Sequence, residues 1–348
     1  MEKAMIECRG LCKTYRVAKR EAGLGNAVKA LFSREYELVR ALREVSFTVQ
    51  DGEIVGYIGP NGAGKSTTIK TMCGILTPDA GECVINGRTP WKERKRHVRE
   101  IGVVFGQRSQ LWWDIPVMDS FHLLRDMYKI EPVVYKRNLE ELTELLGLKE
   151  ILKTPVRNLS LGQRMRCEIA ASLLHDPRIL FLDEPTIGLD AVSKLNVRRF
   201  IKKRNREHGT TVILTTHDMQ DIEALTERVL LIGKGRLLMD GKLDELKRYC
   251  STKKTLRIKY RGQMPELFEG AALLEKQGFA SGESGPGEEP GGERAGEMTL
   301  SLDPKVRSVS AAIADLAAQT ELLDVSVTDI TAEEMVAELY KEYQISFP

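Results

Sequence analysis

The stretch GPNGAGKST, residues 59–67, has the composition and spacing of a phosphate-binding loop. It matches G-x-x-x-x-G-K-[ST] and stands between a strand-like IVGYIG and a helix-like TTIKTM. Its glycines let the backbone wrap around a phosphate chain, Lys65 supplies a mobile positive charge, and the Ser66 hydroxyl can ligate Mg²⁺. A plain glycine-rich turn is the weaker alternative, so the pattern predicts a site for a nucleoside triphosphate and Mg²⁺. The residues expected to contact the nucleotide here are Gly59, Pro60, Asn61, Gly62, Ala63, Gly64, Lys65, Ser66 and Thr67.

A pair of carboxylates follows an apolar run in RILFLDEP. Asp183 and Glu184 come at the end of this run, where a buried parallel strand would deliver them to the ligand-binding edge of an open sheet. Burying two acids without a cation is costly, so Asp183 is predicted to hold Mg²⁺ and Glu184 to polarise the attacking water. A pair that only caps a helix is the alternative, and the complete phosphate loop weakens it.

Two further features lie where they can face a phosphate. His217 comes just after the strand-like TVILTT, and either a structural role or a contact with the terminal phosphate fits that position. The turn NLSLGQRM, residues 158–165, leads into the helix-like RCEIAASLL and presents backbone amides where that helix starts. The chain thus carries two phosphate-seeking turns about a hundred residues apart.

The elements around these motifs alternate. Strand-like apolar stretches at residues 54–59, 101–106, 178–184 and 210–216 are separated by helical patterns, which indicates a mainly parallel sheet with helices on its faces. Apolar residues three and four apart predict helices over 117–128 and 135–148. After about residue 249 the pattern changes to that of a small α+β domain, with helices over 265–278, 304–320 and 331–343 and strands near 252–262, 296–302 and 322–329.

Two segments interrupt these units. The basic stretch 17–37 has apolar residues at helical spacing and is expected to be a short helix, either packed on its own domain or contacting a partner or membrane. The segment 281–297 is rich in Gly and Glu and is expected to be a disordered loop.

Bulk properties limit the function classes. The 348 residues exceed one typical domain, and a net charge of +2 gives no argument for binding nucleic acid or an anionic membrane. The six cysteines lack C-x-x-C spacing, which suits a reducing cytosol and gives no zinc or disulfide framework. The sequence has no signal-peptide pattern and no apolar run long enough to span a membrane, so we expect a cytoplasmic protein that reaches a membrane only through a partner.

Taken together and in this order, the motifs resemble those of the ATPase subunit of ATP-binding-cassette (ABC) transporters over roughly residues 5–240. LSLGQ resembles the family signature, with Leu161 where glycine is commonest, and GLD ends at Asp190 of the interface loop. The resemblance implies an α/β P-loop NTPase fold of the ABC ATPase type, with a mixed sheet core. It places the nucleotide-binding domain at 1–245, a helical subdomain at about 108–165, and an accessory α+β domain at 250–348.

The same resemblance assigns further roles. Gln107 would contact Mg²⁺ and signal to the membrane subunit, His217 would be the switch histidine, and Tyr15 would stack on adenine, unless it is a core tyrosine. Two cassettes would pack head to tail, so that the signature of one closes on the ATP held by the other. The residues implied to serve the partner's nucleotide or the dimer interface are Ser160, Gly162, Gln163 and Asp190.

The expected partners follow from this family. A homodimer or cassette pair with ATP at its interface would dock on integral membrane permease subunits near 107–121, at the inner face of the cell membrane. Trp112 and Trp113 are candidate contact anchors there, although packing inside the helical subdomain explains them equally well. The finer pattern resembles the drug-export (ABC-2) branch. A soluble ABC ATPase acting on ribosomes or DNA is the alternative; one phosphate loop and no sustained heptads argue against it.

Overall fold

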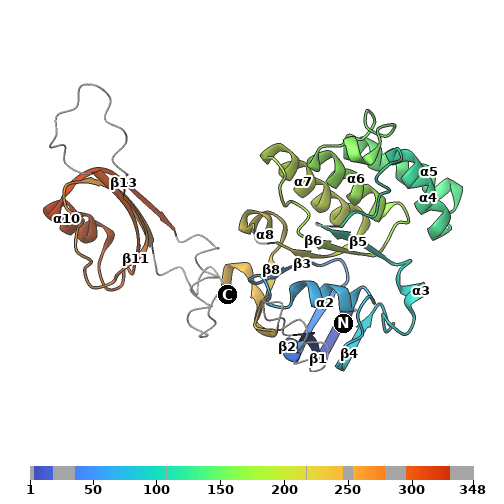
Figure 1. Cartoon of the computed structure of the whole chain (residues 1–348), viewed down its shortest axis with the longest axis horizontal. Coiled ribbons are helices and arrows are strands. Elements are labelled where there is room, and N and C mark those ends of the chain that lie inside the picture. Colours follow the sequence, from blue (N-terminus) through green and yellow to red (C-terminus); the bar gives the residue numbers. More distant parts are fainter. Residues whose placement is uncertain are drawn as a thin grey trace, which may run out of the picture. The chain divides into compact units, whose positions relative to one another are not determined.

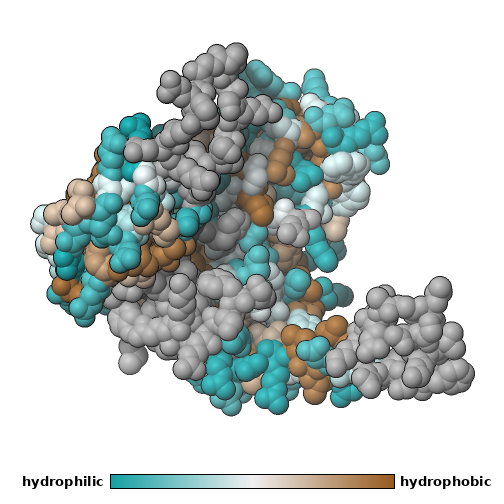
Figure 2. All heavy atoms as spheres, turned by 60° about the vertical axis from the view of Figure 1, so that its left-hand side comes forward, coloured by the Kyte–Doolittle hydropathy of each residue, from teal (hydrophilic) through white to brown (hydrophobic). Residues whose placement is uncertain are grey.

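The computed structural model describes residues 4–18, 36–106, 108–216, 218–245, 254–278 and 295–329. These residues form two compact units, which divide between Leu243 and Asp244 (Figure 1). On the face seen in Figure 2, hydrophilic and hydrophobic side chains of the described residues are interspersed. Within the described ranges, no helix is both long and apolar enough to cross a bilayer.

A six-stranded sheet forms the centre of the first unit, in the order β5-β6-β7-β3-β8-β9. All neighbours pair in parallel except β8 and β9, which form a hairpin. The continuous apolar strands are buried on both faces, as parallel sheets require, and this confirms the predicted α/β fold with a mixed sheet core. The strands are β3 (Ile54–Ile58), β5 (Ile101–Phe105), β6 (Ile179–Asp183), β7 (Thr211–Thr215), β8 (Arg228–Gly233) and β9 (Arg236–Lys242).

A second, antiparallel sheet in the order β2-β1-β4 packs on the first through α2 (Figure 1). Ile69 and Met72 of α2 share one buried cluster with Phe47 of the small sheet and Phe181 of the central sheet, so the helix is clamped between the two. The elements are β1 (Ala4–Ala18), β2 (Tyr36–Gln50), α2 (Lys65–Met72), β4 (Ala80–Ile85) and the short α3 (Arg94–His97).

Helices cover the opposite face of the central sheet (Figure 1). Their bounds are α4 (Val117–Tyr128), α5 (Pro132–Leu145), η1 (Val156–Asn158), α6 (Leu161–Leu173), α7 (Ala191–His208) and α8 (Met219–Leu225). The helices predicted over 117–128 and 135–148 are confirmed by α4 and α5. The predicted helix within 17–37 falls mostly on residues 19–35, outside the described residues, while β1 and β2 extend into both ends of that range.

The second unit is a four-stranded antiparallel sheet in the order β11-β12-β10-β13. This strand order, with α10 between β12 and β13 in the chain, is that of a ferredoxin-like fold. Here the connection from β10 to β11, residues 262–270, contains no helix. Leu256, Ile258 and Leu300 pack with Leu316 of α10. The bounds are β10 (Lys254–Arg261), β11 (Ala271–Gly278), β12 (Ala295–Leu302), α10 (Val309–Gln319) and β13 (Glu321–Asp329).

Two predictions for this unit are wrong. The helix expected over 265–278 is an irregular segment followed by β11, because Gly270 has φ 88° and the next eight residues pair with β12. Residues 295–297, expected in the Gly/Glu-rich loop of 281–297, begin β12; the rest of that loop lies outside the described residues, as does the helix expected over 331–343. The helix over 304–320 is shorter than expected, since Ser308 caps it.

His175 ties the helical layer to the edge of the central sheet. Its ring stacks on Tyr128 at the end of α4, with 4.2 Å between centroids, and its Nε2 donates to the Ile101 carbonyl of β5 at 2.9 Å. Burial lowers the pKa of His175 to about 4. The folded protein therefore excludes a proton that the unfolded chain takes up below the ordinary value of 6.5.

We accordingly expect the free energy of unfolding to fall as the pH is lowered from about 7.5 to about 4.5, with His175 contributing about 2–3 kcal/mol of that loss. In His175→Gln this part of the loss disappears, since glutamine does not titrate. Urea unfolding at several pH values measures the difference. The exposed His122→Gln serves as control and keeps the full pH dependence; equal slopes for His175→Gln and the wild type would contradict the assignment.

Candidate active site

The phosphate loop connects β3 to α2 by a tight backbone path. Gly62 has φ 77° and Gly64 has φ 115°, conformations that residues with a Cβ rarely adopt. A Cβ on Gly64 would also lie 2.6 Å from the carbonyl oxygen of Ala41 in β2. Gly64 is the N-cap of α2 and has no side chain to bond the first amides. These amides are therefore directed toward the loop, where an anion can accept from them.

Lys65 is folded back onto its own loop. Its Nζ donates to the carbonyls of Gly59 at 2.5 Å and Pro60 at 3.0 Å, and the residue is only 7% exposed. Burial lowers the pKa of Lys65, and the negative charges of Glu184 and Asp183 oppose that shift. The ammonium group thus stands near two carboxylates and is held by weak carbonyl partners that a phosphate chain can replace.

The carboxylate pair lies at the carboxyl end of β6. Asp183 accepts a hydrogen bond from Thr215 Oγ1 of β7 at 2.5 Å, which fixes the carboxylate. The backbone at Glu184 turns sharply, with φ 56°, and its N–H donates to the Thr215 carbonyl at 3.0 Å. A non-glycine residue in this left-handed region carries backbone strain of about 1 kcal/mol or more, and such strain concentrates at functional sites. The turn directs Asp183 and Glu184 differently from a continuing strand.

Gly106 closes the neighbouring strand end against this pair. Its N–H donates to the Asp183 carbonyl at 2.8 Å, and a Cβ there would lie 2.8 Å from the Glu184 carbonyl oxygen. The next part of this segment is bonded to Glu168 of α6. The Ser109 Oγ donates to the Glu168 carboxylate, and the Gln110 N–H donates to the same carboxylate at 3.1 Å. The segment after β5 is therefore attached to the acidic strand end on one side and to the signature helix on the other.

These parts surround one cleft of about 520 Å³. It is lined by Asn61, Ser66, Lys70, Ile75, Phe105, Gly106, Arg108, Asp183, Glu184 and Ile187. Ser66 and Asp183 offer oxygen donors in the same cleft, which suits Mg²⁺, a hard cation that takes one or two protein ligands together with phosphates and water. The donor chemistry fits the predicted ion. Among the described residues, no group of three or more His, Cys, Asp or Glu side chains is arranged to hold a metal ion.

The signature turn does not line this cleft. Ser160 is the N-cap of α6 and forms a capping box with Gln163: the Ser160 N–H donates to Gln163 Oε1 at 2.9 Å, and the Gln163 N–H donates to Ser160 Oγ at 3.2 Å. Ser160 is exposed. Beside it, a Cβ on Gly162 would lie 3.0 Å from Ser193 Oγ, and Ser193 also bonds both carboxylate oxygens of Asp190. The start of α6 and the start of α7 are thus in close contact.

The remaining predicted site residues do not line this cleft or lie outside the described residues. Tyr15 is half-buried on β1, opposite Val39 of β2, and lies outside the residues that line the cleft. Gln107 and His217 lie outside the described residues, so their roles stay predictions. Thr215, Gly106 and Glu168 were not predicted. The end of the TVILTT strand was a usable signal for Thr215, since parallel strand ends meet at one edge; Glu168 had no local signal.

Comparison with known proteins identifies the family. A family model described as ABC transporter matches residues 42–187. The ABC transporter ATP-binding protein NatA of Bacillus subtilis is 32% identical over 215 residues, which cover 62% of this chain and 87% of NatA. The chain belongs to the ABC transporter ATP-binding proteins.

Other comparisons agree with this family. The uncharacterized ABC transporter ATP-binding protein YhcH of Bacillus subtilis is 35% identical over 195 residues; the match covers 56% of this chain and 63% of YhcH. The bacitracin transport ATP-binding protein BcrA of Bacillus licheniformis is 32% identical over 62% of this chain and 69% of BcrA. The dimeric, post-hydrolysis structure of the ATP-binding cassette MJ0796 with ADP and Pi is 27% identical, with TM-score 0.57, over 69% of this chain and 99% of that one. The predicted ABC ATPase class and fold are confirmed.

The tight contact at Gly106 gives a test of the site. In Gly106→Ala the new methyl group meets the Glu184 carbonyl, so the segment after β5 moves away from the carboxylates. We expect ATP turnover to fall roughly tenfold to a hundredfold, as small misplacements at a reacting centre do. Steady-state phosphate release measures this.

Gly209→Ala is the matched control. Gly209 ends α7 with φ 63°, and a Cβ there meets no atom within 4 Å. That variant should lose about 1 kcal/mol of stability through backbone strain and keep its turnover. Unchanged turnover in Gly106→Ala would show that the contact has no bearing on the site.

Proposed function

We propose that this chain is the ATP-hydrolysing subunit of an ABC transporter and works as a head-to-tail pair. The observation that carries the proposal is the separation of the two phosphate-seeking turns: the loop at 59–67 shares a cleft with Asp183 and Glu184, while the exposed, capped turn at Ser160 lies outside it. A second copy supplies what each cleft lacks. The MJ0796 cassette, whose structure is described as dimeric, supports this arrangement.

In the pair, the first amides of α6 from one copy complete the nucleotide site of the other. Gln163 N–H is used by the capping box and Arg164 N–H donates to the Ser160 carbonyl, which fixes the orientation of the turn. The positive end of α6 then faces a γ-phosphate across the interface, where partial charges at a helix start favour an anion. Because ATP is contacted from both sides, it favours the closed pair, and hydrolysis removes that preference.

The chemistry assigned to this chain is activation of water. Glu184 polarises the attacking water and takes its proton at the carboxylate, while Lys65 neutralises the phosphate oxygens. Ser66 and Asp183 would hold Mg²⁺, with Gln107 as the further predicted ligand; the ion, when bound, stabilises the charge that develops on the transferred phosphoryl group. A general base of this kind contributes about 3–5 kcal/mol to lowering the barrier.

Coupling to a membrane subunit is assigned to the segment after Gln107. Within 107–121, Leu111 and Phe121 are buried, whereas Trp112 and Trp113 are 39% and 51% exposed. The guanidinium group of Arg164 on α6 lies over the Trp113 ring, with 5.8 Å between the guanidinium carbon and the ring centroid. Two exposed tryptophans, one of which contacts the signature helix, are suited to receive a permease segment and to pass its displacement to Ser160.

The names of related proteins support a role in export. They include the bacitracin transport protein BcrA and the linearmycin resistance ATP-binding protein LnrL of Bacillus subtilis, 34% identical over 205 residues. We infer that the present chain acts on the cytoplasmic face of the membrane, bound to permease subunits, and exports a compound that those subunits select.

The first test is Glu184→Gln. The amide keeps the shape of the side chain but takes no proton, so turnover should fall by about 10²–10⁴-fold while ATP still binds and an ATP-stabilised dimer accumulates. Phosphate release and gel filtration with and without ATP measure the two effects. The exposed Glu150→Gln is the control and should keep wild-type turnover. Wild-type turnover in Glu184→Gln would remove that residue from catalysis.

The second test separates the two halves of the composite site. Ser160→Arg blocks the signature and Lys65→Ala removes the phosphate-loop charge, so each homodimer should be inactive, although Ser160→Arg still binds ATP as a monomer. In a mixture, the phosphate loop of one variant meets the intact signature of the other, and turnover should reappear. Mixed dimers that form without regaining turnover would argue against a site shared between copies.

A further inference from the structure

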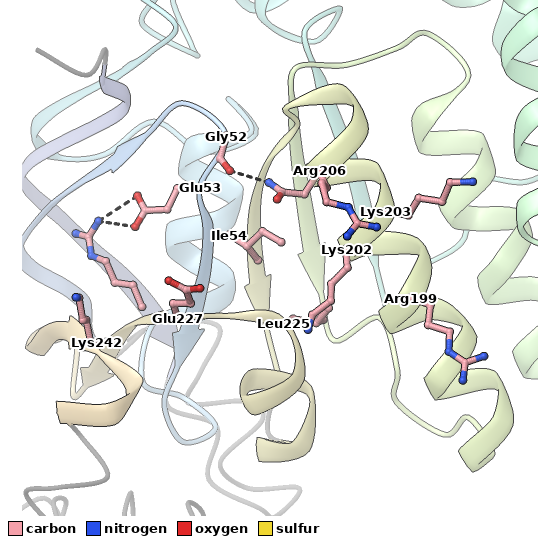
Figure 3. Close-up of a pocket in the computed structure, with 12 residues that line it drawn as sticks. Gly52, Glu53, Ile54, Arg199, Lys202, Lys203, Arg206, Leu225, Glu227 and Lys242 are labelled. Atoms are coloured by element: carbon pink, nitrogen blue, oxygen red, sulfur yellow. Dashed lines mark hydrogen bonds and ion pairs between the residues drawn. The ribbon is translucent and has the colours of Figure 1, made fainter.

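A second cavity, of about 830 Å³, lies at the opposite end of β3 from the phosphate loop (Figure 3). Ile54, the first residue of β3, lies on its wall, whereas the phosphate loop follows the last residue, Ile58. The lining residues are Gly52, Glu53, Ile54, Arg199, Lys202, Lys203, Asn205, Arg206, Leu225, Glu227, Arg228 and Lys242. Six of these are basic and two are acidic, so the cavity carries a positive excess.

Most of the charge comes from one face of α7. Arg199, Lys202, Lys203 and Arg206 stand at positions i, i+3, i+4 and i+7, which places them in one row along the helix (Figure 3). With a rise of about 1.5 Å per residue, the row is about 10 Å long. All four side chains line the cavity, whose wall also includes Ile54 and Leu225. In Figure 3, Lys202 extends from α7 toward Leu225, whereas Lys203 and Arg199 extend away from that side of the helix.

Cationic side chains elsewhere on α7 form ion pairs, as expected for cations with a structural role. Lys194 pairs with Asp218 at 2.5 Å, Arg198 with Asp221 at 2.5 Å, and the buried Arg204 with Asp176. Each of these three side chains has an acidic partner on another element. Burial of an unpaired charge is costly, so these pairs are required by the packing of α7.

The row facing the cavity is different. Arg199, Lys202 and Arg206 are exposed, and within the residues that the structure describes no acidic group lies within ion-pair distance of them. Lys203 reaches Glu207 only at 3.8 Å. The cavity's own Glu53 does not neutralise the row, because it is bonded to Arg228 at 3.0 Å, which also holds Asp240.

The partial negative charge at the C-terminus of α7 explains only some of the cations in this row. Cations in the last turn of a helix are favoured by its partial negative charge, which explains Arg206 but not Arg199, two turns earlier. Like charges at i, i+3 and i+4 repel one another and destabilise a helix slightly. A row that the fold does not neutralise, over a concave surface of this volume, has the properties of a binding site for an anion.

We propose that this cavity binds a small ligand that carries several phosphate groups, of the polyphosphate or nucleoside polyphosphate class, separately from the nucleotide cleft. The guanidinium group of Arg206 suits bidentate contacts with phosphate, and the Lys202 ammonium adds a mobile charge beside it. The exposed Arg199 extends the positive surface along α7. The volume is that of a site for a compact ligand rather than an extended polymer. The proposal does not depend on the transporter function.

Binding of inorganic tripolyphosphate to the full-length chain tests it. All proteins carry Lys65→Ala, so that the phosphate loop contributes equally weakly to each. Isothermal titration calorimetry should show that Lys202→Glu/Arg206→Glu raises the dissociation constant about tenfold or more, while Lys202→Gln/Arg206→Gln gives an intermediate loss that shrinks with added salt. The changed side chains are exposed, and circular dichroism checks that folding is retained.

Lys149→Glu/Lys153→Glu is the matched control, with the same charge change and the same i, i+4 spacing at exposed positions outside the cavity. It should bind tripolyphosphate as the parent protein does. Equal losses in both double variants, or no loss in either, would overturn the proposal.

Phosphatidylglycerol vesicles and an octaglutamate peptide are titrated in parallel. If the Lys202/Arg206 substitutions weakened binding of the vesicles or of the peptide, and tripolyphosphate did not bind, the proposal would also be overturned. The row of cations would then be assigned to a membrane surface or to an acidic partner protein, respectively.

Discussion

The register of the parallel strands is the constraint on which the nucleotide site depends. Asp183 of β6 lies opposite Phe105 of β5 and Thr215 of β7, and Thr215 lies opposite Tyr57 of β3. Three of these strands therefore end at one level and β3 ends one residue beyond it, so the chain segments that follow them meet there. A shift of one residue in β6 would place Leu182 at this level and turn the carboxylate to the other face of the sheet. The apolar, fully buried strands make such a shift costly.

The same edge also connects the cleft to the surface that would meet other proteins. Gly106 bonds the Asp183 carbonyl, and Ser109 and Gln110, three and four residues later, bond Glu168 on α6. Burial raises the pKa of Glu168, while its hydrogen bonds from Ser109 and Gln110 oppose that shift and stabilise the charged carboxylate. A displacement of this segment thus acts on a helix whose N-cap is the exposed Ser160. Hydrogen bonds thus attach this short segment to the acidic strand end through Gly106 and to α6 through Ser109 and Gln110. Under the proposed function, the segment would link the nucleotide to the signature turn.

Local patterns predicted those parts of the site whose chemistry is contained in consecutive residues. The loop at 59–67 and the acidic pair at 183–184 could be recognised because their residue types and spacing are contained in short consecutive stretches. Thr215 was not, since its role comes from the register of β6 against β7, and Glu168 acts through residues 58 and 59 positions away. The helix expected over 265–278 failed for a related reason: its apolar spacing suited a helix, but pairing with β12 and the conformation of Gly270 decided the outcome. Long-range pairing is the information that a single sequence does not display.

The two ends of the central sheet offer anions two different kinds of site. At the carboxyl ends of the strands, α2 and α6 begin, and unpaired backbone amides with partial positive charge are available. At the other end, α7 finishes at Gly209, where carbonyl groups carry partial negative charge and draw in cationic side chains such as Arg206. An α/β unit can therefore bind phosphate through its backbone at one edge and through Arg and Lys side chains at the other. Backbone amides are fixed by the fold, whereas exposed side chains can be exchanged without disturbing it, so substitutions at the second edge can change anion binding and leave the fold intact.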